Sequence, residues 1–149
     1  SDRGIVIDRV IADYAAGAVE RLVEEAQVAD LLVVEGQGAL AHPAYSGVTT
    51  SILHGSVPDA LVMCHEAGRE AIHGYESFDI PPLPEYVDIY ERLAAPISDA
   101  SVAAGMLNTR HLDDDAAADA VTGYSDALDA PATDPVRHGV PDEVLDAIL

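Results

Sequence analysis

A carboxylate directly after an apolar run is the first feature of this sequence with a chemical use. Residues 31–34 (LLVV) are expected to form a buried strand, and Glu35, Gly36, Gln37 and Gly38 follow it. A glutamate at the end of such a strand can hold Mg²⁺, directly or through water, or polarise a water molecule. The two glycines would let the backbone approach a cofactor closely, and the Gln37 amide is a candidate for substrate binding. The alternative is that Glu35 only caps a helix or pairs with an arginine.

The loop after these glycines carries three more polar or aromatic side chains, His42, Tyr45 and Ser46. A histidine near a cleft can act as a general acid or base, because its pKa lies near neutrality. The Tyr45 and Ser46 hydroxyls are candidates for substrate binding. The alternative is a loop histidine with satisfied hydrogen bonds beside a packed tyrosine.

A second polar group follows the apolar run 60–64 and consists of His65, Glu66 and Arg69. His65 and Glu66 are candidate bases, but neighbours on an extended chain point to opposite sides. At most one of them is therefore expected to face a cleft unless the chain turns there. Cys64 is expected to be buried in the strand and inert. The histidine spacing matches no common zinc motif, so zinc is weakly supported.

A third apolar run, 101–109, ends in Asn108 and Thr109, which we consider as cofactor-binding residues. The Asn108 amide could read the edge of a nucleotide base, although an ordinary turn asparagine is equally consistent with the sequence. A weaker candidate of the same kind is the stretch around Arg137, after a short last strand expected within 130–139.

The elements that must position these residues alternate along the chain. We expect strands at 31–34, 60–64, 101–109 and within 130–139, helices at 7–27, 48–55, 85–93, 112–124 and 141–149, and a loop at 68–84. Alternating strands and helices predict an α/β fold in which a parallel sheet has helices on both faces. Ligands bind such sheets beyond the carboxyl ends of the strands, where all the candidate residues lie. One α/β domain, residues 1–149, is the expected organisation.

The charge balance excludes several functions. The chain has 27 acidic residues, seven arginines and no lysine, and its formal net charge is −20. Nucleic acid is therefore not an expected partner, and neither a Schiff base nor a phosphate-loop lysine is available in this chain. The composition is like that of proteins from halophilic organisms. One cysteine, with no apolar stretch long enough to span a membrane and no signal peptide, predicts a cytoplasmic protein with no membrane partner.

Two resemblances add to this interpretation. "LLVVEGQG" and "VAAGMLNT" resemble motifs of the dethiobiotin-synthetase-like branch of phosphate-loop proteins. In that branch the glutamate helps to hold a metal and the asparagine lies near the base. The resemblance implies a phosphate-loop NTPase-like fold in three layers, with Glu35 as a Mg²⁺ residue and ATP as the nucleotide.

The second resemblance covers nearly the whole chain. "LLVVEGQGALAHPAYSGVTTSILHGSVPDALVMCHEAGRE", "IPPLPEYVDIYE" and "TDPVRHG" are similar to the C-terminal domain of the DgcN family, long known only as a domain of unknown function. Some members are named D-glutamate N-acetyltransferase. The family implies a two-domain protein whose glycine-rich phosphate loop precedes the matched region, so we expect this chain to lack that loop and the first strand. We also expect it to be inactive alone and to self-associate as a homo-oligomer.

These resemblances leave two enzymatic hypotheses and one structural one. The first is transfer of acetyl from acetyl-CoA to D-glutamate or a related small molecule, with Glu35, His42, His65 and Glu66 as candidate bases. Arg69 or Arg137 would then hold a substrate carboxylate. The second is a Mg²⁺- and ATP-dependent enzyme in which Glu35 serves the metal. The third is a structural or oligomerising domain without activity.

Overall fold

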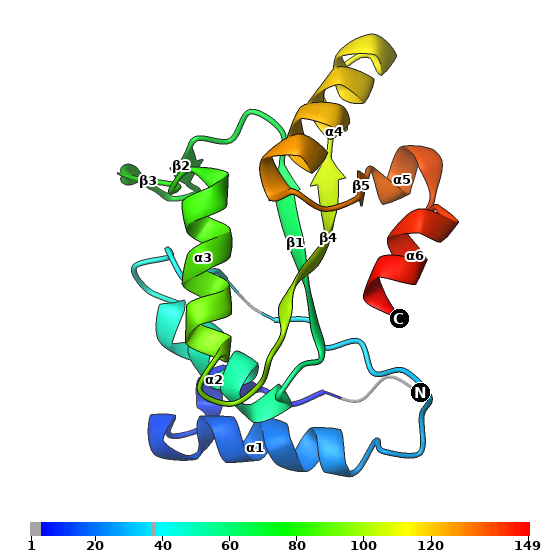
Figure 1. Cartoon of the computed structure of the whole chain (residues 1–149). Helices are drawn as coiled ribbons and strands as arrows, with labels where there is room; N and C mark the ends of the chain where they lie inside the picture. The colour runs from blue at the N-terminus through cyan, green and yellow to red at the C-terminus, as the bar shows by residue number, and fades with distance from the viewer. Residues whose placement is uncertain (1–3, 37) are drawn as a thin grey trace.

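The structure, a computed structural model, describes residues 4–36 and 38–149. A parallel three-stranded sheet with the strand order β1-β4-β5 lies at its centre (Figure 1). The strands are β1 (Ala60–Glu66), β4 (Ser101–Asn108) and β5 (Ala132–Thr133). A separate antiparallel pair is formed by β2 (Ala71–Ile72) and β3 (Tyr75–Asp79). The predicted α/β fold with a parallel sheet is confirmed.

Helices connect and cover these strands. They are the short 3-10 helix η1 (Ile7–Arg9) and the α-helices α1 (Ala12–Glu24), α2 (Ser46–Ser56), α3 (Leu83–Ala94), α4 (Asp114–Leu128), α5 (Pro135–His138) and α6 (Asp142–Ile148). In Figure 1, α3 lies on one side of the β1–β4 pair and α6 on the other. Within the residues that the structure describes, no helix is long and apolar enough to cross a membrane.

The main core lies between the sheet and the two helices α3 and α4. Met63 of β1 and Leu107 of β4 pack there with Tyr124 and Leu128 of α4, and all four are buried. Gly105 of β4 permits this close approach, because a Cβ atom at that position would lie 2.6 Å from a ring carbon of Tyr124. A small residue in the strand therefore lets α4 sit directly on the sheet.

A second, smaller core joins α1 to α2. Ile7, Ala15 and Val19 are buried there, with Val48 and Ile52 of α2 packed against them. Ala15 and Val19 lie on the buried face of the helix predicted within residues 7–27, whereas Ile11 and Tyr14 are exposed. The helix itself is shorter than predicted, since it begins at Ala12 and ends at Glu24.

The predicted strand at residues 31–34 is wrong. These residues have no regular secondary structure, and all four side chains are exposed, with Val33 at 86%. An apolar run forms a buried strand only when a neighbouring strand accepts its backbone hydrogen bonds and helices cover its faces. Among the described residues β1 pairs only with β4, so no strand performs this role for 31–34.

The predicted loop at residues 68–84 is also wrong in part. Its first half forms the β2–β3 hairpin, in which Ile72 pairs with Tyr75 across Gly74, a residue with φ of 77°. The three prolines of this segment, Pro81, Pro82 and Pro84, all lie after β3. Pro82 and Pro84 instead mark the start of α3, where proline is well tolerated.

Candidate functional site

The carboxyl ends of β1, β4 and β5 lie side by side, as the parallel topology predicts. Glu66, the last residue of β1, is in register with Asn108, the last residue of β4. Met106 of β4 is in register with Thr133 of β5, and Asp134 follows directly. Polar side chains from three separate segments therefore meet at one edge of the sheet, where ligands of such folds bind.

Asp134 is the most enclosed carboxylate at this edge, with 2% of its surface exposed. It accepts hydrogen bonds from the backbone amide of Thr109 (3.0 Å), the Thr109 hydroxyl, and the amides of Val136 (2.9 Å) and Arg137 (3.2 Å). Burial alone raises the pKa of Asp134, but these hydrogen bonds outweigh it and lower that pKa to about 2. Asp134 is therefore an anion that fastens the start of α5 to the end of β4.

Arg137 completes this internal network. Its guanidinium group donates to the Thr109 hydroxyl (2.9 Å), the Thr109 carbonyl (3.2 Å), the Leu112 carbonyl (2.5 Å) and the Asp114 carboxylate (2.5 Å). Thr109 is fully buried, and its hydroxyl both donates to Asp134 and accepts from Arg137. The side chains of Thr109 and Arg137 thus act on the protein itself in this structure.

Two other arginines meet at Glu66. Arg69, in the turn after β1, pairs with one Glu66 oxygen through Nη2, and Nη2 of Arg110 lies 3.5 Å from the other oxygen. Arg110 was not among the residues singled out from the sequence. Arg110 lies two residues beyond the end of β4, and this position after a parallel strand is the sequence signal that would have identified it.

The side chain of His65, at the end of β1, lies on the side of the strand that faces α4. Its ring stacks on Tyr124 of α4, with ring centroids 6.1 Å apart and planes 14° apart. Burial, and then the positive charge of Arg69, lower the pKa of His65. A hydrogen bond with the Arg69 backbone and the nearby Glu66 carboxylate raise this pKa, but by less. The imidazole is therefore mainly neutral at pH 7.

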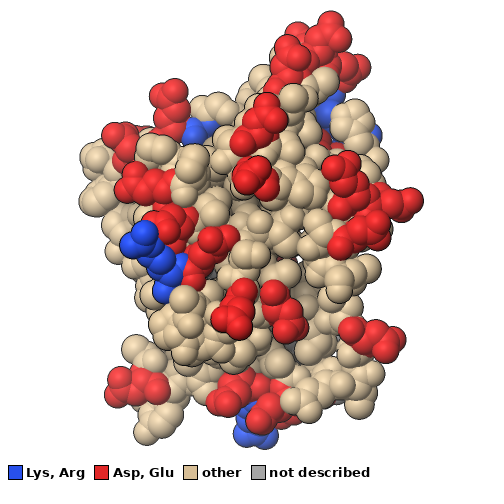
Figure 2. Space-filling view, viewed as in Figure 1, with Lys and Arg blue, Asp and Glu red and all other residues tan. Residues whose placement is uncertain are grey.

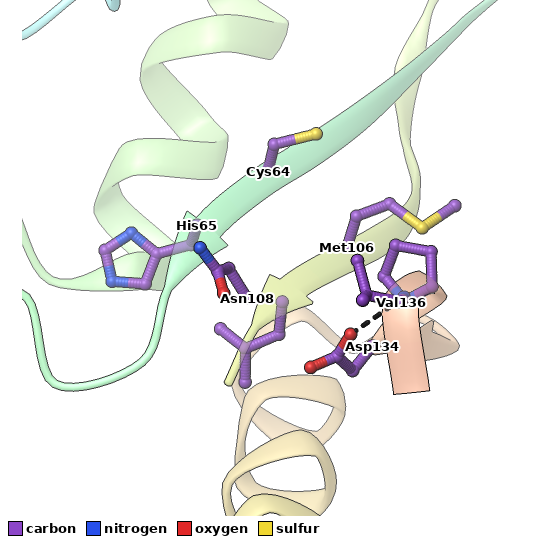
Figure 3. A pocket seen from close by; sticks show the side chains of 8 residues that line it. Cys64, His65, Met106, Asn108, Asp134 and Val136 are labelled. Carbon is purple, nitrogen blue, oxygen red and sulfur yellow. Dashed lines mark hydrogen bonds between the residues drawn. The ribbon is translucent and has the colours of Figure 1, made fainter. Parts of the chain in front are cut away.

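A shallow hollow of about 180 Å³ opens beside these strand ends. Figure 3 shows its lining side chains, with Cys64 and His65 projecting from β1 in different directions and Met106 and Asn108 coming from β4. The lining is mostly apolar, and Val136 from α5 closes one side. The exposed Asn108 holds its own turn, because its side-chain oxygen accepts from the Arg110 amide at 3.2 Å.

Cys64 is exposed, so the prediction that it is buried is wrong. β1 is an edge strand, and the side that carries Cys64 and Val62 remains partly open. The atoms packed around its sulfur, and then the Glu35 carboxylate, nevertheless raise the pKa of the Cys64 thiol. The thiol therefore stays protonated at neutral pH, and the same interaction places Glu35 near β1.

The segment after Glu35 is shaped by its glycines. Gly36 and Gly38 are exposed. Gly38 has φ of 68°, and a Cβ atom there would lie 2.5 Å from Cβ of Tyr45, so only glycine fits. Gln37 lies outside the described residues. Ser46 begins α2, and Tyr45 is half exposed just before it.

His42 belongs to a separate aromatic group. Its ring lies 4.4 Å from Tyr45 and 5.0 Å from Tyr75 of β3, between centroids, and its Nδ1 accepts from the Ala44 amide at 3.1 Å. Tyr90 and Tyr86 of α3 hold this loop, since their hydroxyls accept from the backbone amides of residues 40 and 41 at 3.2 and 3.4 Å. These two hydroxyls therefore anchor the loop to α3.

The described residues include no group of three or more histidine, cysteine or acidic side chains placed to hold a metal ion. The structure thus brings Glu66, Arg69, His65 and Asn108 to the carboxyl-terminal edge of the sheet. Thr109, which is fully buried, and Arg137 lie close by. His42 and Tyr45 lie in another loop, and Ser46 begins α2 after it. The catalytic and binding roles assigned to these residues from the sequence stay predictions.

The geometry can now be set beside known proteins. Residues 1–145 match the family described as "Domain of unknown function (DUF1611_C) P-loop domain". The chain belongs to this family. A crystal structure of a DUF1611 family protein from Anabaena variabilis superposes with a TM-score of 0.92 at 39% sequence identity, covering 98% of this chain and 43% of that one. Phosphate loops commonly contain a lysine that contacts the nucleotide phosphates. The sequence of this chain contains no lysine.

Two relatives carry the name D-glutamate N-acetyltransferase. The protein from Tritonibacter scottomollicae is 38% identical over 137 residues, and that from Pseudoalteromonas sp. is 35% identical over 143 residues. The matches cover 91% and 94% of this chain, but only 41% and 42% of the relatives. The chain therefore spans less than half the length of the proteins that bear this name.

Proposed function

We propose that the protein transfers an acetyl group from acetyl-CoA to the amino group of D-glutamate or a related amino acid. The observation that carries the proposal is the name shared by the two relatives, which match more than nine-tenths of this chain. The geometry supports it with a neutral histidine, two exposed arginines and a hollow at one sheet edge.

The reaction begins with loss of a proton, because the substrate amine is an ammonium ion at neutral pH. His65 is the base that the structure favours, since its imidazole is neutral and half-buried beside Arg69. The free amine then forms a C–N bond with the thioester carbonyl carbon, and the C–S bond breaks. The second amine proton goes to the departing thiolate, which leaves as the thiol.

Acetyl-CoA supplies the activated acetyl group, and the residues proposed to bind it fit in part. Asn108 is exposed at the hollow and its amide nitrogen is available to a ligand. Gly36 and Gly38 are exposed and would allow a close approach of backbone and coenzyme. Thr109 fits less well, because its side chain is buried and engaged on both sides.

The test is an assay of thiol release by the full-length protein with acetyl-CoA and D-glutamate in high salt. Release should require the amino acid and should fall by two to four orders of magnitude in His65→Ala, the usual range for loss of a general base. Glu35→Gln and His42→Ala test the other candidate bases. Thiol release that does not depend on an amino acid would contradict the proposal.

A second candidate function is Mg²⁺- and ATP-dependent chemistry, favoured by the phosphate-loop family to which the chain belongs. Glu35 would then serve the metal, since Mg²⁺ commonly takes only one or two carboxylates besides phosphate oxygens and water. Phosphate release that requires Mg²⁺ and is lost in Glu35→Gln, without thiol release, would establish it. If neither activity appears and the substitutions change only stability, the domain has a structural role.

Cellular location and assembly are proposed on separate grounds. We expect the protein to be cytoplasmic, since its single cysteine cannot form an internal disulfide. We also expect it to self-associate, because residues 31–34 expose four apolar side chains in a row. Light scattering of the full-length protein and of Val33→Asp at equal concentration tests the assembly. A monomer in both cases would contradict it.

A further inference from the structure

Cations are scarce on this protein and three of them collect at the strand ends. The chain has seven arginines and no lysine against 27 acidic residues, and Figure 2 shows acidic side chains spread over the visible face. Arg69, Arg110 and Arg137 lie in the segments directly after β1, β4 and β5. Most of the surface repels an anionic ligand, whereas this edge carries three of the seven arginines.

Only two of these arginines have donors to spare. The Arg137 guanidinium is spent on four hydrogen bonds within the protein, and 23% of its side chain is exposed. Arg69 and Arg110 are 43% and 75% exposed, and each pairs with Glu66 through Nη2. Because a guanidinium group has five N–H donors, most of those on Arg69 and Arg110 remain available to a ligand.

The pair carries an excess positive charge. Two guanidinium groups face the single carboxylate of Glu66, which they hold by one oxygen each. Planar guanidinium groups match the geometry of carboxylates, which is why arginine commonly recognises them. Glu66 thus shows that both side chains converge on a carboxylate-sized volume.

We propose that Arg69 and Arg110 bind the two carboxylates of an acidic amino acid, with the α-carboxylate on Arg69 and the side-chain carboxylate on Arg110. The order follows from His65, which is hydrogen-bonded to the backbone of Arg69. The amino group lies one bond from the carbon bearing the α-carboxylate, so this order brings it toward the imidazole. This inference rests on the proposed acetyl transfer and makes Arg110 the residue that selects an acidic side chain.

The test compares D-glutamate with D-glutamine, which carries a neutral carboxamide in place of the side-chain carboxylate. Binding of both to the full-length protein is measured by calorimetry, alongside steady-state kinetics, for the wild type, Arg110→Gln and the control Arg21→Gln. Arg21 is an equally exposed arginine in α1 that pairs with Glu25. Loss of a charged hydrogen-bonding partner should weaken D-glutamate about 10- to 100-fold in Arg110→Gln, as Kd and KM, with kcat little changed.

D-Glutamine should bind wild type and Arg110→Gln within about threefold, because it lacks the carboxylate that Arg110 would bind. Arg69→Gln should weaken both amino acids, since both carry the α-carboxylate. Arg110→Lys keeps the positive charge but loses the paired guanidinium donors, so its Kd for D-glutamate should fall between those of the wild type and Arg110→Gln. Equal loss of both amino acids in Arg110→Gln, or no loss of D-glutamate, would overturn the assignment.

Coenzyme A also offers anions, and the kinetics separate that source. If Arg110→Gln raises the KM for acetyl-CoA and leaves that for D-glutamate unchanged, the pair binds phosphate and the proposal is wrong. If the wild type binds D-glutamate in an Arg110-dependent way but releases no thiol, the acetyl-transfer proposal fails while the arginine assignment stands. If thiol is released and Arg110 has no effect on D-glutamate, the reverse holds.

Discussion

Removing the Asp134 carboxylate should destabilise the protein strongly. The side chain is 2% exposed and accepts four hydrogen bonds, three of them from backbone amides. Asp134→Ala leaves those donors without their acceptor and removes the carboxylate that lies 3.8 Å from Nε of Arg137, which typically costs about 3–5 kcal/mol. For a chain of this size each kcal/mol lowers Tm by roughly 2–4 °C, so Tm should fall by about 6–20 °C.

Circular dichroism of thermal unfolding in constant salt measures this loss. Asp146→Ala is the matched control, because it removes an exposed aspartate in α6 and should change Tm little. The lowered pKa adds a second signature. Asp134 is more acidic folded than unfolded, so its contribution is full above pH about 4 and is lost as pH falls toward 2. Equal Tm values for Asp134→Ala and Asp146→Ala would refute the reasoning.

Four further outcomes follow from the packing and charges. Gly105→Ala should lower the free energy of unfolding by about 1–3 kcal/mol in urea titration, because the new methyl group meets the Tyr124 ring. Tyr90→Phe removes an acceptor for a loop amide at 3.2 Å, so proteolysis of that loop should be faster while Tm falls only slightly. The pKa of His65 is lowered by burial and then by Arg69, so the acidic limb of kcat/KM should lie below pH 6.5 and move upward in Arg69→Gln. Added NaCl should raise Tm, because a net charge of −20 repels itself less when screened; a fall in Tm would contradict this.

Much of the fold could be predicted from the sequence because its patterns are local. The apolar runs of β1 and β4 and the helical pattern of α1 each indicate their own structure. The run 31–34 has the same local pattern as β1, yet it remains exposed. Strand formation depends on a partner elsewhere, which no local pattern contains.

The hairpin was missed for a related reason. β3 is exposed along its whole length, so it lacks the alternation of apolar and polar residues that marks a half-buried strand. Gly74 between two short segments was the available turn signal.

For the candidate site, the meeting of the strand ends was predictable from the sequence, whereas the hydrogen-bond partners of the arginines were not. Parallel strands had to bring Glu66 and Asn108 together, and they do. Whether an arginine faces a ligand or the protein depends on neighbours distant in sequence. Arg137 is engaged by Thr109 and Asp114, residues 28 and 23 positions away, whereas Arg110 remains largely exposed.

The measurement that tests the central claim most directly is mass-spectrometric detection of N-acetyl-D-glutamate. Full-length protein is incubated with acetyl-CoA and D-glutamate, with His65→Ala under the same conditions. The account predicts product from the wild type in equal amount to the released thiol, and a large loss in the variant. Thiol release without the acetylated amino acid, or equal product from His65→Ala, would contradict it.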